Sequence, residues 1–254
     1  MTAAVILAAA ALVTSIISAI LGMGGGIMLL AAMFCFMPHS DAIPTHAAVQ
    51  IASNGTRVMV FIKNVDRTSL AKFIIGVVPG SAIGMTLLWL LGELERSEPY
   101  LKLLIGAFIL AVTFAPQRPH GDRPAPKWFN FTLVGLIAGT AALTVGAVGP
   151  LIAPVFPRLG FTKERLIATK AICQLATHVL KIPAFLLVRD LDVARLSGLA
   201  VLMICMAVPG TLIGRRMLKH VSERQFLLAY RVALTLAGVK LLVVDGLWPI
   251  AAGQ

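Results

Sequence analysis

Two apolar stretches of the chain each carry a row of polar residues at helical spacing. In residues 44–62 the row consists of His46, Gln50, Ser53, Asn54 and Arg57. In residues 165–187 it consists of Lys170, Gln174, Thr177, His178 and Lys181. Because residues three or four apart share one side of a helix, each row predicts a single polar face. Amide, hydroxyl and cationic groups donate hydrogen bonds, so two such faces can together hold an anion.

Arg57, Lys170 and Lys181 are cations on these faces, and we expect no acidic residue in the middle of any span. The eleven acidic residues are assigned to loops or span ends: Asp41, Asp66, Glu93, Glu95, Glu98, Asp122, Glu164, Asp190, Asp192, Glu223 and Asp245. A buried charge without a partner is strongly unfavourable, so a bound anion or water must compensate these cations. This pattern favours an anionic substrate over a cation channel, a carboxylate proton relay or a carboxylate sodium site.

Other interpretations of the polar faces stay open. Hydroxyl side chains such as Ser53 and Thr177 also join helices to one another inside membranes. The three cations can instead extend along their helices until the charge reaches the membrane surface. His46 and His178 leave proton coupling open, because a histidine changes charge near neutral pH.

The composition places both rows inside a membrane protein. Of the 254 residues, 58% are apolar and only 13% are charged, with a mean hydropathy of +0.91. An average soluble domain is about 45–50% apolar and about 25% charged, so an ordinary soluble protein is excluded. Charges and helix breakers divide the chain into ten apolar segments: 3–21, 26–37, 44–62, 69–91, 99–116, 129–146, 150–157, 165–187, 196–214 and 225–244. A span needs roughly 20 residues, so 26–37 and 150–157 are too short to cross.

Each short segment follows a glycine-rich break. The first break runs from Gly22 to Gly26 and the second from Gly146 to Pro150. A long apolar helix precedes each one, which predicts a bent hairpin in the membrane. Glycine allows close backbone approach, and a helix start offers unpaired N–H groups to an anion. Candidate contacts here are Gly24, Gly25, Gly26 and Gly149. The alternative is that these glycines only allow tight helix packing.

The two halves of the chain match each other. At an offset of 124, Gly25 falls on Gly149 and Gln50 on Gln174. At an offset of 130, the run from Pro79 to Gly84 falls on the run from Pro209 to Gly214. Two nearly constant offsets indicate an internal duplication. We therefore expect membrane repeats at 1–117 and 128–254, joined by a proline-rich linker at 118–127.

The distribution of cations predicts opposite orientations for the two repeats. Stretches 63–72, 118–127, 158–165 and 215–224 hold 13 Lys and Arg residues, against 4 in 92–102 and 188–195. Basic loops prefer the cytoplasm. With the first set inside, 44–62 runs inward and 165–187 outward. The predicted fold class is an all-α polytopic membrane protein with two inverted-topology repeats, each a glycine-broken helical hairpin followed by three spanning helices.

The partners that we expect are a small anion and the lipid bilayer, and no nucleic acid, although the net charge is +11. The sequence does not specify the oligomeric state. Cys35, Cys173 and Cys205 are widely spaced in apolar runs, which predicts neither a disulfide framework nor a paired-cysteine metal site. We expect no cofactor and no bound metal.

These motifs together resemble the sulfite exporter TauE/SafE family of membrane proteins over most of the chain. The resemblance is carried by Gly22-Met23-Gly24-Gly25-Gly26, Ala47-x-x-Gln50-x-Ala52-Ser53, Pro79-Gly80-x-x-x-Gly84 and their second-half counterparts. It implies a permease or exporter of small organosulfur anions, such as sulfite or sulfoacetate, in a bacterial inner membrane. One departure is Val148, where the family often has another glycine.

We therefore expect a transporter, with the anion bound between the repeats near the membrane midplane, as in other transporters with broken helices. The alternatives are a membrane-embedded enzyme and a nonenzymatic membrane assembly protein. The chain has no H-E-x-x-H metal helix and no G-x-S-x-G nucleophile turn, so we expect no enzyme.

The charge distribution makes a prediction about topology. With the three native cysteines replaced by serine, Gly121→Cys should react with a membrane-impermeant thiol reagent only from the cytoplasmic side. Gln254→Cys should react only from the periplasmic side. Labelling of both positions from the same side would reject the inverted topology. So would the reverse pattern, with position 121 labelled from the periplasm and position 254 from the cytoplasm.

Overall fold

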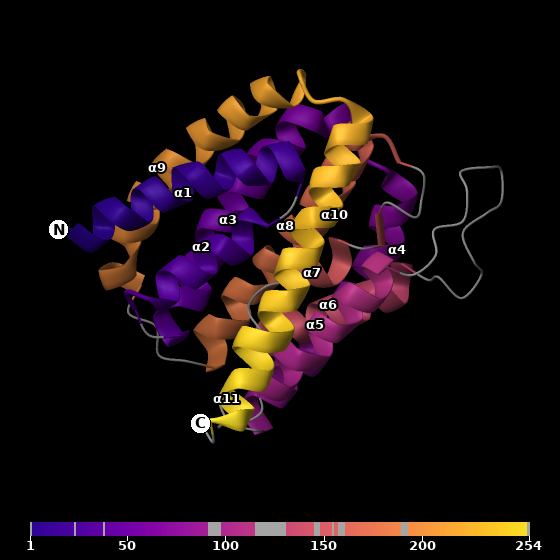
Figure 1. The fold of residues 1–254 in the computed structure, drawn as a ribbon. Coiled ribbons are helices and arrows are strands. Elements are labelled where there is room, and N and C mark those ends of the chain that lie inside the picture. Colours follow the sequence, from indigo (N-terminus) through magenta and orange to yellow (C-terminus); the bar gives the residue numbers. More distant parts are fainter. Residues whose placement is uncertain are drawn as a thin grey trace.

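The computed structural model describes residues 2–22, 24–37, 39–90, 98–114, 131–144, 148–153, 155–156, 161–188 and 193–252 (Figure 1). Within these ranges the chain forms helices with short connections and no strand. The first half contains α1 (Thr2–Leu21), α2 (Gly25–Phe34), α3 (His39–Phe61), η1 (Ile62–Asn64), α4 (Arg67–Leu90) and α5 (Glu98–Phe114). The second contains α6 (Phe131–Thr144), α7 (Gly149–Ile152), α8 (Lys163–Val188), α9 (Val193–Leu218), α10 (Glu223–Val239), η4 (Lys240–Leu247) and α11 (Trp248–Ala251).

Each predicted segment corresponds to a helix, with differences at the ends. Helix α3 begins at His39 rather than near Pro44, which lies within the helix. Proline favours the first turn of a helix, which is why the sequence suggests a later start. Helix α7 has only four residues, with a proline in its first turn. The predicted linker at 118–127 lies outside the described residues.

The last helix corrects one expectation. Helices α10, η4 and α11 form one continuous element, in which η4 is a π-helix. Asp245 therefore lies inside a candidate span from Arg224 to Ala251 and not beyond its end. Its carboxylate accepts a hydrogen bond of 2.7 Å from Lys240, five residues earlier. A cation one helical turn away allows an acidic residue at this depth.

Among the described residues, four helical stretches are long and apolar enough to cross a membrane: Thr2–Leu21, Arg67–Leu87, Leu196–Leu218 and Arg224–Ala251. Helices α3 and α8 are not among them, although they have 23 and 26 residues. Polar residues on one face of each lower the hydropathy of these two helices. Helices of this kind need protein neighbours to cover the polar face.

The packing provides those neighbours. Helices α3 and α8 pack against each other in the middle of the bundle, and α9 and α4 also cover them (Figure 1). Helix α1 lies alongside α9, and α4 lies alongside α6. Helix α5 packs against α10 and η4.

Glycines bring the outer helices into close contact. A Cβ atom on Gly80 would lie 2.1 Å from the carbonyl oxygen of Leu136, so any side chain there would collide with α6. A Cβ atom on Gly210 would lie 2.5 Å from the carbonyl oxygen of Leu12 on α1. The Thr140 hydroxyl also donates a 3.0 Å hydrogen bond to the Gly80 carbonyl. Both proline-glycine pairs therefore serve close helix packing.

Candidate functional site

The predicted polar faces of α3 and α8 meet in the interior. The rings of His46 and His178 pack edge to face, with their centroids 5.6 Å apart. None of the ten polar residues on these two faces is more than 9% exposed. The sequence pattern therefore located a buried polar cluster between helices that are more than 100 residues apart in the chain.

A small pocket lies inside this cluster. Its lining residues come from the ends or faces of α1, α2, α3, α7 and α8: Ser18, Gly24, Gly26, Ile27, His46, Gln50, Val148, Gly149, Gln174 and His178. The predicted contacts in this wall are Gly24, Gly26, Gln50, Gly149, Gln174 and His178. The cavity measures about 10 Å³, which is about the space that one water molecule needs. A larger anion can enter only if the helices move apart.

The glycine breaks lie directly beside the two glutamines, and the second break leaves room for Gln174 that a side chain would fill. A Cβ atom on Gly26 would lie 3.4 Å from Nε2 of Gln50, and one on Gly149 would lie 2.8 Å from Nε2 of Gln174. Gly24 precedes α2 with a φ of +88°, a conformation that favours glycine. The first N–H groups of α2 have no acceptor within the helix, and this end of α2 borders the pocket.

Gly25 and Val148 differ from this pattern. A Cβ atom on Gly25 would lie 2.0 Å from the carbonyl oxygen of Thr14, so Gly25 allows α2 to pack closely on α1. Substrate contact at Gly25 stays a prediction. Val148 precedes α7 with a φ of −88°, in contrast to the left-handed Gly24 that precedes α2. The two breaks thus have different backbone conformations.

The remaining predicted residues surround the pocket without lining it. The Arg57 guanidinium donates a 3.1 Å hydrogen bond to the Ser53 hydroxyl. The Asn54 amide donates to Oε1 of Gln50 at 3.4 Å, and the Thr177 hydroxyl donates to the Gln174 carbonyl at 2.7 Å. Asn54 therefore contacts the side chain of one pocket glutamine, whereas Thr177 bonds to the backbone of its own helix.

Two of the buried cations, Arg57 and Lys170, contact neutral oxygen atoms. Lys170 donates a hydrogen bond from Nζ to the carbonyl of Gly22, in the first glycine break. In the part of the chain that the structure describes, neither Arg57 nor Lys170 contacts a carboxylate. Lys170 lies near Arg57, and Lys181 lies near His46. All three cations are at most 1% exposed, which contradicts the alternative that their charges reach the membrane surface.

Several buried polar atoms of the cluster have no hydrogen-bond partner among the described residues. They are Nδ1 of His46, Oδ1 of Asn54, Nε of Arg57 and Nδ1 of His178. Buried polar atoms are almost always paired in proteins, so such a group of atoms points to a ligand or water in this region. The Nε–H group of Arg57 is a donor, so it can form a hydrogen bond to an anion.

Sequence reasoning missed three hydroxyl residues of the cluster. Ser18 on α1 lines the pocket, and the Ser15 hydroxyl lies 3.4 Å from that of Ser53. The Thr211 hydroxyl on α9 lies 3.2 Å from the same Ser53 hydroxyl. The signal on α1 was the spacing of Ser15 and Ser18, which places both on one face of an otherwise apolar helix.

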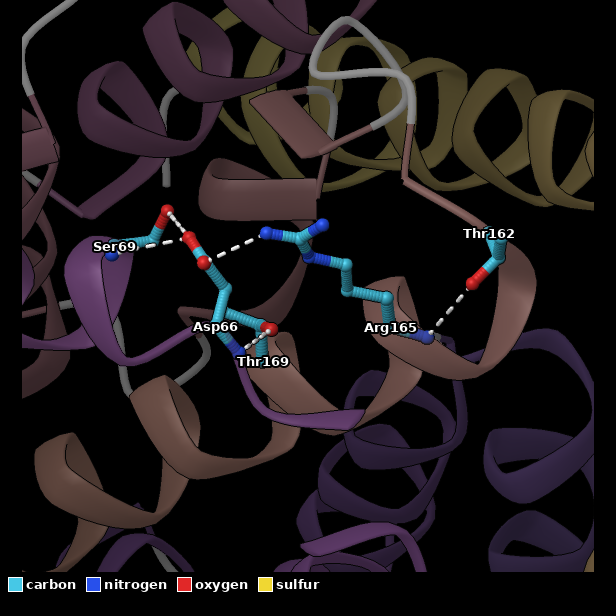
Figure 2. A network of polar contacts seen from close by, with 5 residues as sticks. All are labelled: Asp66, Ser69, Thr162, Arg165 and Thr169. Carbon is cyan, nitrogen blue, oxygen red and sulfur yellow. Dashed lines mark hydrogen bonds and ion pairs between the residues drawn. The ribbon is translucent and has the colours of Figure 1, made fainter. Parts of the chain in front are cut away.

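A second polar network ties the start of α4 to α8 (Figure 2). The Asp66 carboxylate accepts a 2.8 Å hydrogen bond from Arg165 and a 3.1 Å hydrogen bond from the backbone N–H of Ser69. The Asp66 N–H donates to the Thr169 hydroxyl at 2.9 Å. Thr169 precedes the buried Lys170, so this network joins the two halves of the chain beside one cation of the cluster.

The environment of Asp66 favours its charged form. Partial burial raises the pKa of its carboxyl group, but the hydrogen bonds from Ser69 and Arg165 and the charge of Arg165 together lower it more. The pKa therefore lies below the ordinary value of 3.8. Asp66 stays ionised at neutral pH, and its bond to Arg165 is preserved.

A model of the family described as Sulfite exporter TauE/SafE matches residues 7–241. The chain therefore belongs to the TauE/SafE family, whose members are exporter-type transporters of sulfite and related sulfur anions. Family membership and the four apolar helices identify a multi-pass membrane transport protein. No curated protein and no solved structure matches the chain.

The Asp66 network predicts a loss of stability in acid. A lowered pKa means that the Asp66 bonds stabilise the fold above about pH 4 and are lost as the pH falls through the folded-state pKa. Asp66→Asn should lower the melting temperature of the purified protein at pH 7. A loss of about 1 kcal/mol corresponds to about 2–4 °C for a chain of this size. Solvent screens the half-exposed Arg165, so a larger loss is not expected.

The control is Glu164→Gln, which removes a carboxylate 3.9 Å from Lys163 at the start of the same helix. Its melting temperature should match that of the unchanged protein. The stability gap between Asp66→Asn and the unchanged protein should narrow as the pH approaches 3. Equal melting temperatures at pH 7 for Asp66→Asn and the control would contradict this role of Asp66.

Proposed function

We propose that this TauE/SafE family member transports a small sulfur oxyanion, such as sulfite or sulfoacetate, through the polar cluster between α3 and α8. One observation carries the proposal: Arg57 and Lys170 are fully buried, and among the described residues their hydrogen-bond partners are neutral oxygen atoms. Buried positive charge is costly unless a negative charge compensates it. The transported anion supplies that charge during each cycle.

Neutral donors bind the anion directly in this proposal. Gln50 and Gln174 direct side-chain amides at the pocket, and the N–H groups at the start of α2 add backbone donors. Ser53, Asn54 and Thr177 become available when the pocket widens. Arg57, Lys170 and Lys181 provide the positive potential from behind this first layer. A neutral pocket wall backed by buried charge holds an anion without binding it too tightly to release.

In this proposal, His46 and His178 are the side chains that exchange any proton transported together with the anion. Nε2 of His46 lies 2.8 Å from the Gly26 carbonyl, which can only accept a hydrogen bond. Nε2 therefore carries the hydrogen, and in a neutral ring Nδ1 is a proton acceptor. Because Nδ1 of His46 has no partner among the described residues, a protonated anion can donate to it. Transport of the anion with a proton and transport of the anion alone both fit this arrangement.

The proposed architecture is a pair of inverted repeats, at 1–117 and 128–254, around a two-fold axis between α3 and α8. Such an axis exchanges α1 with α6 and α4 with α9. If α1 packs against α9, the axis therefore requires that α6 packs against α4. Both pairs are present, and they are the two long outer contacts. The contact of Gly80 with Leu136 corresponds to that of Gly210 with Leu12. These residues differ by 130 and 124, the two offsets of the sequence duplication.

We place the transporter in a bacterial inner membrane, with export as the favoured direction. The cell interior is negative, so moving one negative charge outward releases about 2.3 kcal/mol per 100 mV. Export therefore needs no ion-coupling carboxylate, in agreement with the composition of the cluster. The family of transporters favours this function over a membrane enzyme or an assembly protein.

The proposal is tested by comparing two buried residues on α8. Gln174→Leu should weaken sulfite binding to the purified protein by about 10-fold to 100-fold, because a hydrogen bond to a charged group contributes about 1.5–3 kcal/mol. Lys170→Met should also weaken binding, without lowering the melting temperature, because it removes a costly buried charge and keeps most of the apolar stem. Affinity and melting temperature are measured on the same samples.

Lys72→Met, which removes an exposed cation on α4, is the control and should bind sulfite normally. A structural role for the cluster predicts the reverse, with low melting temperatures and normal affinity in the protein that folds. Normal affinity in both the Gln174 and the Lys170 variants would reject the proposed site.

A further inference from the structure

A second and much larger pocket opens where α3 ends. Its volume is about 480 Å³, and its wall is formed by the end of α3, by η1, by the start of α8 and by the end of α9. The lining cations are Lys63, Arg215 and Lys219. The wall includes residues of the basic stretches 63–72, 158–165 and 215–224, which the charge distribution assigns to the cytoplasm.

The charge in this pocket is largely unpaired. Lys63, Arg215 and Lys219 are exposed, and within the described residues none of them forms an ion pair. The one carboxylate in the wall, Glu164, lies 3.9 Å from Lys163. One cation from η1 and two at the end of α9 therefore line one cavity. The single acid among its described lining residues lies near another lysine.

The pocket lies at the end of the contact between α3 and α9 that leads to the buried cluster. On α3, Phe61 follows Arg57 by one turn, and on α9, Arg215 follows Thr211 by one turn. Thr211 contacts Ser53 inside the cluster, whereas the Arg215 guanidinium lies 5.8 Å from the centre of the Phe61 ring. The Phe61–Arg215 contact thus lies at the pocket, one helical turn along α3 from Arg57 and one turn along α9 from Thr211.

We propose that this pocket is a second anion site, which binds a compact oxyanion group through Lys63, Arg215 and Lys219. The guanidinium fork of Arg215 fits two oxygen atoms of such a group, and the two flexible ammonium groups adjust to the others. If the bound group is the transported anion, the inference rests on the proposed function. In that case the pocket concentrates the anion beside the Phe61–Arg215 contact before the anion reaches Arg57.

The same chemistry is presented by the phosphate of an anionic lipid. Met59 and Ile62 line the pocket and are 72% and 54% exposed, so acyl chains can pack beside a bound headgroup. Basic pockets between helices on the cytoplasmic side are a recognised form of headgroup site. The experiment below distinguishes the two sources of the oxyanion, which are the free transported anion and the lipid headgroup.

The test compares two triple variants that lose the same charge on the same side of the protein. The pocket variant is Lys63→Gln, Arg215→Gln and Lys219→Gln. The control variant is Arg67→Gln, Lys72→Gln and Arg216→Gln, three exposed cations that do not line the pocket. All six side chains are exposed, so both proteins should fold, and their melting temperatures verify this.

The first arm measures sulfite flux in vesicles of phosphatidylcholine alone. If the pocket concentrates the free anion, the flux rate of the pocket variant should fall about tenfold at low sulfite concentration and change little at saturation. The control variant should keep its rate at both concentrations. The second arm measures phosphatidylglycerol that remains bound to the purified protein. If the pocket holds a lipid, the pocket variant should lose this lipid and the control variant should keep it.

A specific loss in either arm supports the second anion site and identifies its source. Equal behaviour of the two triple variants in both arms would overturn it. Failure of the unchanged protein to move sulfite would count against the proposed function, whereas the lipid arm would still decide whether the pocket binds an oxyanion.

Discussion

The burial of Arg57, Lys170 and Lys181 between α3 and α8 is the constraint on which the rest of the molecule depends. Each charge is at most 1% exposed, and the contacts of Arg57 and Lys170 are hydroxyl and carbonyl oxygens. Removing a cation from water costs several kcal/mol, and neutral dipoles return only part of that cost. The protein carries this cost in its centre, which is reasonable for a transporter whose substrate brings the missing charge.

The outer helices make such a centre possible. Helices α1 with α9 and α4 with α6 approach so closely that Gly80 and Gly210 have no room for a side chain. Backbone contacts of this kind form tight packing inside a membrane, where lipid is as apolar as leucine and gives little drive for association. Tight pairs on two sides keep the polar faces of α3 and α8 together, and the Asp66–Arg165 bond joins the halves at one end (Figure 2).

The sequence was sufficient to predict the helices and the polar faces, because spacing of three and four residues specifies which side chains share a face. The sequence could not predict which residues of the polar faces line the pocket and which lie away from it. Gly26, Gln50 and Gln174 line the pocket, whereas the three cations are not among its described lining residues, and this division depends on tertiary packing. Ser18 was missed because a few hydroxyl side chains on an otherwise apolar helix are usually packing residues. The predicted position of Asp245 at the end of a span was wrong. Its hydrogen bond with Lys240 allows both charges to lie within one long helix, whereas each charge alone suggests a helix end.

The central claim is that an oxyanion binds between α3 and α8, and crystallography with selenite tests it most directly. Selenite is a pyramidal oxyanion like sulfite, and its selenium atom is located by anomalous scattering. In crystals soaked at a concentration that saturates binding in solution, we expect an anomalous peak within hydrogen-bond reach of the Gln50 and Gln174 amides. A peak that is found only elsewhere on the protein, with the space between α3 and α8 unchanged, would contradict the account.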